Sequence, residues 1–265
     1  MSDLFEMGLR ASRRDRAARL GPELFLLERA FADCLDRIAL VQQRFERALL
    51  IGCPDPAWRD RLRERVGQVD VIDPGPTFAE VASGTVVNED EWLPQTGIYD
   101  LVVALGTLDT VNDLPRMFFA IRQSMTENAF LIGAMSGGET LPRLRAAMRA
   151  ADEIAGVATP HVHPRIEASA LAPLLQQVGF ATPVVDVDRV QVSYGSFTKL
   201  VADLRRMGAT NLLSARSRTA LTLRAAEAAA KNFSDAGEGG KTAETFEILH
   251  FAAWTPTSAS NPREG

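Results

Sequence analysis

Hydrophobic and polar positions alternate along the first half of the chain as short apolar runs separated by amphipathic or charged stretches. The apolar runs predict strands at about 48–53, 69–73, 85–87, 99–105 and 130–135. The stretches around them predict helices at about 22–45, 57–66 and 112–125. Because strands and helices that alternate at short intervals form a parallel sheet with crossover helices, the pattern predicts an α/β domain.

The second half of the chain has a different rhythm. We expect helices at about 140–155, 167–178, 196–207 and 219–232, with long strands at 184–194 and 245–254. The pattern divides the chain into an N-terminal arm and helix at 1–46, a domain at 47–256 with a helical insertion at about 196–232, and a disordered tail at 257–265.

Composition narrows the classes of function. The 265 residues carry a net charge of −5, so no overall basic field is present to hold nucleic acid. The two cysteines are far apart, fit no metal spacing and favour a reducing compartment. No apolar run is long enough to predict a transmembrane segment.

Residues 1–20 are rich in arginine, as are mitochondrial transit peptides. Acidic residues are interspersed among these arginines, however, and transit peptides are poor in acids. We therefore expect a retained arm, either mobile or docked on a partner, in a protein of the bacterial cytoplasm.

Several polar residues follow the predicted strands, at the edge where α/β sheets bind ligands. Gly52 begins a turn like the glycine loops of nucleotide-binding folds, but Pro54 and Pro56 lack N–H donors and equally fit a plain turn into a helix. Asp73 fits either a ribose-binding carboxylate or a turn acid. Asp90 and the adjacent Glu91 fit either an adenine contact or a solvated loop.

Two histidine positions have more than one interpretation. His161 and His163 in an extended segment are able to hold a metal or shuttle protons, but spacing indicates no third ligand, so a surface loop is favoured and no metal site is predicted. His250 lies in an apolar strand and is expected to be a core residue. The glycines next to Glu139 suit a loop under a substrate or a simple turn.

Three segments carry a resemblance to a known family. The runs are YDLVVAL at 99–105, VNDLP at 111–115 and LIGAM followed by GGETL between 131 and 141. The chain resembles class I S-adenosylmethionine (SAM) methyltransferases, and more closely the biotin-synthesis malonyl-carrier-protein methyltransferase group. Within that group, segments 183–189, 203–211 and 245–248 are most similar to the respiratory complex I assembly-factor branch, whose mitochondrial member is described as an arginine hydroxylase.

The resemblance implies a Rossmann-like SAM-methyltransferase fold, mostly a parallel twisted sheet with flanking helices and a helical N-terminal arm. It implies SAM as cofactor and a protein substrate or assembly partner. The ribose acid maps onto Asp73 and the adenine-side acid onto Asp90. The expected cofactor-binding residues are Gly52, Cys53, Asp73, Asp90, Glu91 and Leu105, and the expected catalytic, substrate-orienting residues are Asp109, Asn112 and Glu139.

Two functions follow from this resemblance. The first is a SAM-dependent methyltransferase-like protein, or a methyltransferase-like hydroxylase, that acts on a protein in respiratory complex assembly. The second is a non-catalytic scaffold or assembly factor with a degenerate SAM site, which Pro54 and Pro56 favour. The retained Asp73 and Asp90 favour the enzyme.

Overall fold

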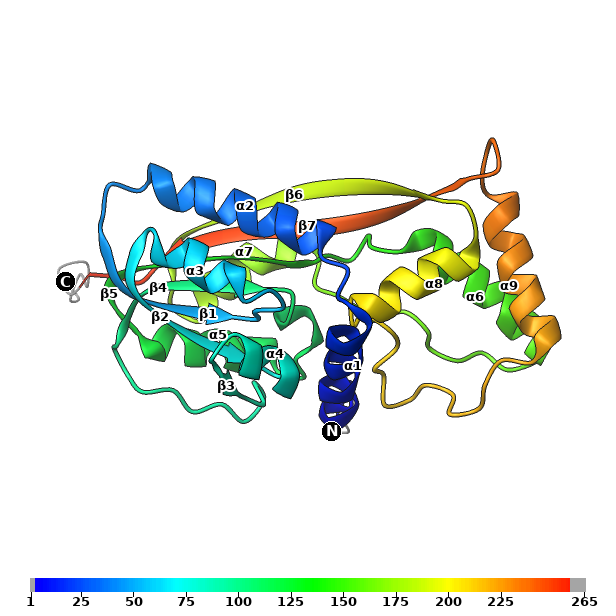
Figure 1. Cartoon of the computed structure of the whole chain (residues 1–265), viewed down its shortest axis with the longest axis horizontal. Coiled ribbons are helices and arrows are strands. Elements are labelled where there is room, and N and C mark those ends of the chain that lie inside the picture. Colours follow the sequence, from blue (N-terminus) through cyan, green and yellow to red (C-terminus); the bar gives the residue numbers. More distant parts are fainter. Residues whose placement is uncertain (1–2, 258–265) are drawn as a thin grey trace, which may run out of the picture.

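The computed structural model describes residues 3–257, and within them seven strands form one sheet (Figure 1). Their order is β3-β2-β1-β4-β5-β7-β6. The strands are β1 (Phe45–Ile51), β2 (Val66–Asp73), β3 (Thr85–Val86), β4 (Tyr99–Leu105), β5 (Met125–Ser136), β6 (Ala181–Tyr194) and β7 (Thr242–Trp254). The first five pair in parallel, and β7 pairs antiparallel with both β5 and β6. The predicted Rossmann-like, mostly parallel fold is therefore confirmed.

Helices cover both faces of this sheet. The helices are α1 (Met7–Leu20), α2 (Phe25–Leu40), α3 (Ala57–Arg63), α4 (Pro76–Val81), α5 (Leu114–Ser124), α6 (Pro142–Ala155), α7 (Ala168–Gln177), α8 (Phe197–Arg206) and α9 (Leu223–Asp235). One apolar core joins α2 and α3 to the sheet, where the rings of Phe31 and Trp58 stack with centroids 4.7 Å apart. The other core joins α5 and α7 to the opposite face. The central strands are buried on both faces, as parallel strands require.

Strands β6 and β7 are longer than the parallel strands and continue beyond them (Figure 1). Helices α6, α8 and α9 gather around that extension and share a third apolar cluster, which includes Leu204 and Phe233. The second half of the chain thus builds an annex on the same sheet. The helices predicted at 196–207 and 219–232 correspond to α8 and α9 of this annex.

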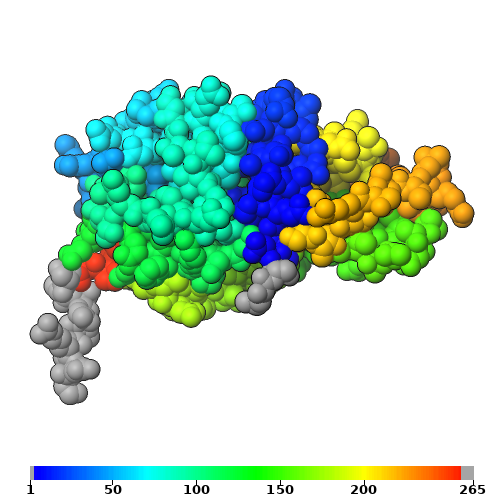
Figure 2. All heavy atoms as spheres, turned by 90° about the horizontal axis from the view of Figure 1, so that it is seen from below, coloured from blue at the N-terminus to red at the C-terminus, as the bar shows by residue number. Residues whose placement is uncertain are grey.

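Helix α1 lies between the annex and the parallel part of the sheet, where it contacts both α4 and α8 (Figures 1 and 2). Residues 7–20 form the predicted helical arm, and the mobile alternative is wrong for them, because Arg10, Arg14 and Ala17 of this helix are buried. Helix α4 was not predicted, since residues 74–76 look like a terminating turn. Its Pro76 instead occupies the first helical position, which proline tolerates.

The remaining expectations concern membranes and the tail. In the span from residue 3 to residue 257, no helix is both long and apolar enough to cross a bilayer. The predicted disordered tail lies outside the described residues except for its first position, 257.

Candidate functional site

The carboxyl end of β2 places Asp73 beneath helix α1, with none of its surface exposed. Arg14 donates to it through Nε, 2.8 Å from Oδ1, and through Nη2, which contacts Oδ2. The backbone N–H of Cys53 reaches Oδ2 at 2.9 Å, and that of Gly75 reaches Oδ1 at 2.7 Å. Burial alone would lower the pKa of Arg14, but the charge and hydrogen bonds of Asp73 outweigh burial and raise it. Arg14 therefore keeps its charge, and the two side chains form a buried ion pair.

A second buried ion pair lies one turn of α1 away. Arg10, four residues before Arg14, makes a bidentate contact with the buried carboxylate of Glu89, and its Nη2 is 3.0 Å from Oε1. The same guanidinium donates to the carbonyl oxygen of Thr107 at 2.7 Å and to the hydroxyl of Thr110 at 2.9 Å. Because residues four apart share one face of a helix, α1 turns both arginines toward the edge of the sheet.

The turn after β1 is packed tightly against the end of β4. Gly52 has φ +81°, and a Cβ there would lie 2.2 Å from the carbonyl oxygen of Leu105, so only glycine fits. Pro56 immediately precedes α3, as expected for a plain turn into a helix. Burial, with the charge of Asp73, raises the pKa of Cys53 to about 12, so its thiol stays protonated. In this conformation the turn is therefore a packed structural element and not an open ligand-binding loop.

The predicted adenine-side acids lie farther out. Asp90 accepts from the backbone N–H of Asn112 and from its side-chain Nδ2, each at 2.8 Å. The side chain of Asn112 also accepts from the backbone N–H of Phe5. Glu91 is exposed. The acid that points inward is Glu89, one position before the residue that the sequence suggested.

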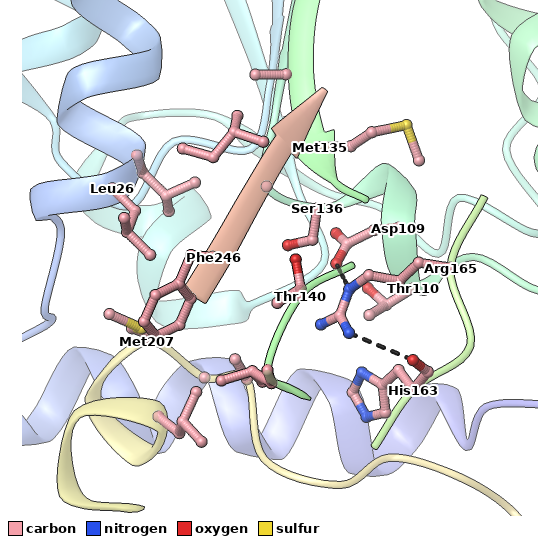
Figure 3. A pocket seen from close by; sticks show the side chains of 18 of the residues that line it. Leu26, Asp109, Thr110, Met135, Ser136, Thr140, His163, Arg165, Met207 and Phe246 are labelled. Atoms are coloured by element: carbon pink, nitrogen blue, oxygen red, sulfur yellow. Dashed lines mark hydrogen bonds and ion pairs between the residues drawn. The ribbon is translucent and has the colours of Figure 1, made fainter. Parts of the chain in front are cut away.

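A cavity of about 110 Å³ opens beside these pairs, between the ends of β4 and β5 and helices α1, α2 and α8 (Figure 3). One side is polar and the other apolar. Its polar side is formed by Asp109, Thr110, Ser136, Thr140 and Arg165, and its apolar side by Leu26, Met207 and Phe246. A cavity with few convergent polar groups and an apolar wall is the usual form of a small-ligand site.

Asp109 faces this cavity but already has a cationic partner. The buried Arg165 places Nε 3.4 Å from its Oδ2, and Nη1 of Arg165 donates to the carbonyl oxygen of His163 (Figure 3). The Nε2 of His163 accepts from the backbone N–H of Leu212 at 2.9 Å, which assigns its proton to Nδ1. Burial, with the nearby charge of Arg165, lowers the pKa of His163 to about 4. The predicted surface loop is therefore wrong at His163, which is a neutral buried residue.

The structure brings only part of the predicted site together. Gly52, Cys53, Asp73 and Leu105 meet at the carboxyl edge, and Asp109 lies in the neighbouring cavity. Asn112 is held in the Asp90 loop. Glu139 is exposed and lines a separate surface cavity with Arg145 and Glu167. Their predicted roles stay predictions.

Sequence reasoning missed Arg10 and Arg14. A signal was present, because these residues and Ala17 recur at i, i+4 and i+7, the spacing of one helical face. Arginine on such a face is usually solvated, so the pattern gave no reason to expect burial. Across residues 3–257, no group of three or more histidine, cysteine, aspartate or glutamate residues is arranged to hold a metal ion.

Comparison with known proteins identifies the family to which this chain belongs. The family model for the methyltransferase domain matches residues 25–184, more than half of the chain. This chain belongs to that methyltransferase family. A protein of Mus musculus named "Arginine-hydroxylase NDUFAF5, mitochondrial" is 32% identical over 95% of this chain and 77% of its own length. A malonyl-[acyl-carrier protein] O-methyltransferase of Xylella fastidiosa is 32% identical over 62% of this chain and 55% of its own length.

Solved structures show the same methyltransferase fold. A protein from Bacillus halodurans described as a putative methyltransferase has a TM-score of 0.58 at 12% identity, covering 86% of this chain and 99% of that one. The N-methyltransferase NodS from Bradyrhizobium japonicum, solved with S-adenosyl-L-homocysteine, has a TM-score of 0.50 at 16% identity, with 94% and 99% covered. These likenesses concern the fold.

The fold family implies a SAM cofactor, which Asp73 would hold through its ribose. An ionised carboxylate accepts about four hydrogen bonds. Asp73 already accepts two from Arg14, one from Cys53 and one from Gly75. SAM therefore does not fit the Asp73 site of this methyltransferase domain while α1 covers it, because a ribose would have to replace Arg14.

Proposed function

We propose that this chain is a SAM-dependent methyltransferase-like protein that acts on a protein substrate during respiratory complex assembly. The observation that carries this proposal is the half-polar cavity at the ends of β4 and β5, next to the Asp73 edge. Membership of the methyltransferase family supports the class of protein. The name of the 32% identical mouse protein, an arginine hydroxylase, supports an arginine-containing substrate, with hydroxylation as the alternative chemistry.

In this proposal Asp109 orients the substrate. Its carboxylate lies in the cavity and is paired with the guanidinium of Arg165, so a cationic substrate side chain would have to share or displace that pair. Proximity and orientation would supply most of the rate enhancement. Asn112 would act indirectly, by fixing the Asp90 loop, and Glu139 would act only from the adjacent surface cavity.

Cofactor loading then requires helix α1 to release Asp73. The methyltransferase domain would exist in two states, a closed one in which Arg14 holds the carboxylate and an open one in which a ribose does. A ligand that binds only the open state has its apparent affinity reduced by the fraction of molecules that are open.

A second candidate is an assembly factor that uses no cofactor. The Arg14–Asp73 pair favours it, because the carboxylate is completely satisfied by the chain itself. In this case α1 is a permanent part of the fold, and the cavity is a remnant or a partner site.

Calorimetric titration with SAM separates these two candidates. The informative variant is Arg14→Met, which removes the competing guanidinium and leaves Asp73 its two backbone donors. Arg19→Gln, on an exposed position of the same helix, is the matched control. If the first candidate holds, Arg14→Met binds SAM at least tenfold more tightly than the wild type, and Arg19→Gln does not differ from the wild type.

Circular dichroism first establishes that both variants are folded. The absence of SAM binding at millimolar concentration in all three folded proteins would contradict the SAM-dependent function and support the second candidate. Asp73→Ala is a poor test of the cofactor, because it leaves Arg14 buried without a partner and disturbs folding directly.

A further inference from the structure

The outer face of α1 carries arginines that have no acidic partners. Arg13 and Arg16 point away from the Asp73 edge and meet arginines from α8 and from the segment before α9. We call this group the arginine basin; its members are Arg13, Arg16, Arg205, Arg216 and Arg218. They line a cavity of about 750 Å³ together with Thr210, Asn211 and Ser217. Figure 2 shows the dark-blue helix α1 beside the yellow and orange segments that supply the other residues.

The charges in the arginine basin do not balance. Glu6 pairs with Arg216, whose Nη1 lies 2.6 Å from its Oε1, and with Arg218 at 3.3 Å. Among residues 3–257, no ion pair joins an acid to Arg13, Arg16 or Arg205. Five guanidinium groups thus share one carboxylate.

Two donors in the basin are also unsatisfied. The Nε atoms of Arg13 and Arg16 are buried and have no hydrogen-bond partner. Burial and repulsion from neighbouring arginines lower the pKa of both side chains, and Arg205 is one source of that repulsion in each case. Buried polar groups in native proteins are nearly always hydrogen-bonded, so these two donors add to the uncompensated positive charge of the basin.

We propose that the arginine basin binds a phosphate-type oxyanion. The planar guanidinium matches phosphate oxygens with two parallel N–H bonds, and several such groups around one cavity neutralise a multiply charged anion. The amide of Asn211 lines the same cavity and uses one of its two hydrogens on the carbonyl oxygen of Pro160, which leaves the other as an additional donor. The chain as a whole carries a charge of −5, so general attraction does not account for an anion there. The site is independent of SAM and of the function proposed above.

Titration of the full chain with pyrophosphate at low ionic strength tests the proposal. The variant is Arg205→Gln, which removes an exposed charge that makes no ion pair. The matched control is Arg149→Gln, an exposed arginine of α6 outside the basin. We expect sub-millimolar binding by the wild type, at least tenfold weaker binding by Arg205→Gln, and no change in Arg149→Gln. Equal weakening in both variants would reduce the effect to general electrostatics and overturn the proposal.

A second measurement distinguishes the source of the phosphate. Flotation with phosphatidylglycerol vesicles, compared with phosphatidylcholine vesicles, asks whether a lipid headgroup is the ligand. Pyrophosphate binding without flotation supports a free phosphate compound. Flotation that Arg205→Gln abolishes and Arg149→Gln leaves intact supports a headgroup, even where pyrophosphate binds weakly. Neither pyrophosphate binding nor flotation, in protein shown to be folded, would overturn the assignment of an oxyanion site.

Discussion

The two faces of helix α1 treat the same residue type in opposite ways. On the inner face, Arg10 and Arg14 are buried and each meets a buried carboxylate. On the outer face, Arg13 and Arg16 meet other arginines. An arginine that pairs with a carboxylate of the same chain stabilises the fold at that point. A group of arginines without such carboxylates implies an anionic partner from outside the chain. Arg13 and Arg14 are adjacent in the sequence, so a step of one residue along the helix separates these two outcomes.

Breaking the ion pair between Arg14 and Asp73 should have the largest effect on stability. Asp73→Ala leaves the guanidinium of Arg14 buried and uncompensated, so we expect the free energy of unfolding to fall by about 3–5 kcal/mol. Urea denaturation measures this change. The double variant Asp73→Asn with Arg14→Met removes both charges and should recover most of the loss. If the free energy of unfolding of Asp73→Ala lies within about 0.5 kcal/mol of the wild-type value, the ion pair does not hold α1 on the edge of the sheet.

Acid should loosen the same region through His163. Its folded pKa of about 4 lies below the ordinary value of 6.5, so the unfolded chain binds more protons between these values. Stability is therefore fully present above pH 6.5 and is lost as the pH falls toward 4, by about 3 kcal/mol from this residue. His163→Gln keeps an acceptor for Leu212 and should show a smaller loss in urea titrations over that range. Parallel curves for both proteins would contradict the assignment.

Removing one repelling charge from the outer face of α1 should have the smallest effect on stability, and the effect should have the opposite sign. Arg13→Gln removes one of the repelling charges, so we expect the melting temperature to rise by roughly 1–2 °C at low salt, as for a like-charge pair worth a few tenths of a kcal/mol. Differential scanning calorimetry measures the shift, and high salt should shrink it because the charges are screened. A fall in melting temperature at low salt would mean that Arg13 is matched after all.

The fold was predictable because its information is local. The apolar runs and the turn residues between them place the parallel strands and most helices within a few residues of their observed bounds. Asp73 was placed correctly at the end of a strand for the same reason. Its partner was not, because Arg14 lies 59 residues earlier and nothing in either segment indicates the other.

The candidate site shows that sequence position alone does not decide which residue of a loop is buried. The sequence suggested Asp90 at the third strand, yet the neighbouring Glu89 is the acid that turns inward. A shift of one residue reverses which side chain is buried, and only the contact with Arg10 from α1 decides between them. His163 illustrates the same limit, since its burial depends on Leu212 and Arg165, which lie in separate segments.

The anchoring of α1 also has a consequence for synthesis on the ribosome. The backbone around Phe5 bridges to Leu213, and Glu6 pairs with Arg216, so the segment that leads into α1 contacts residues made about two hundred positions later. Chains are made N-terminus first, so the inner face of α1 meets Asp73 and Glu89 early, whereas the segment before α1 is fixed only after the segment near 216 has left the exit tunnel. The two ends of the α1 contact surface are therefore completed at different stages of synthesis.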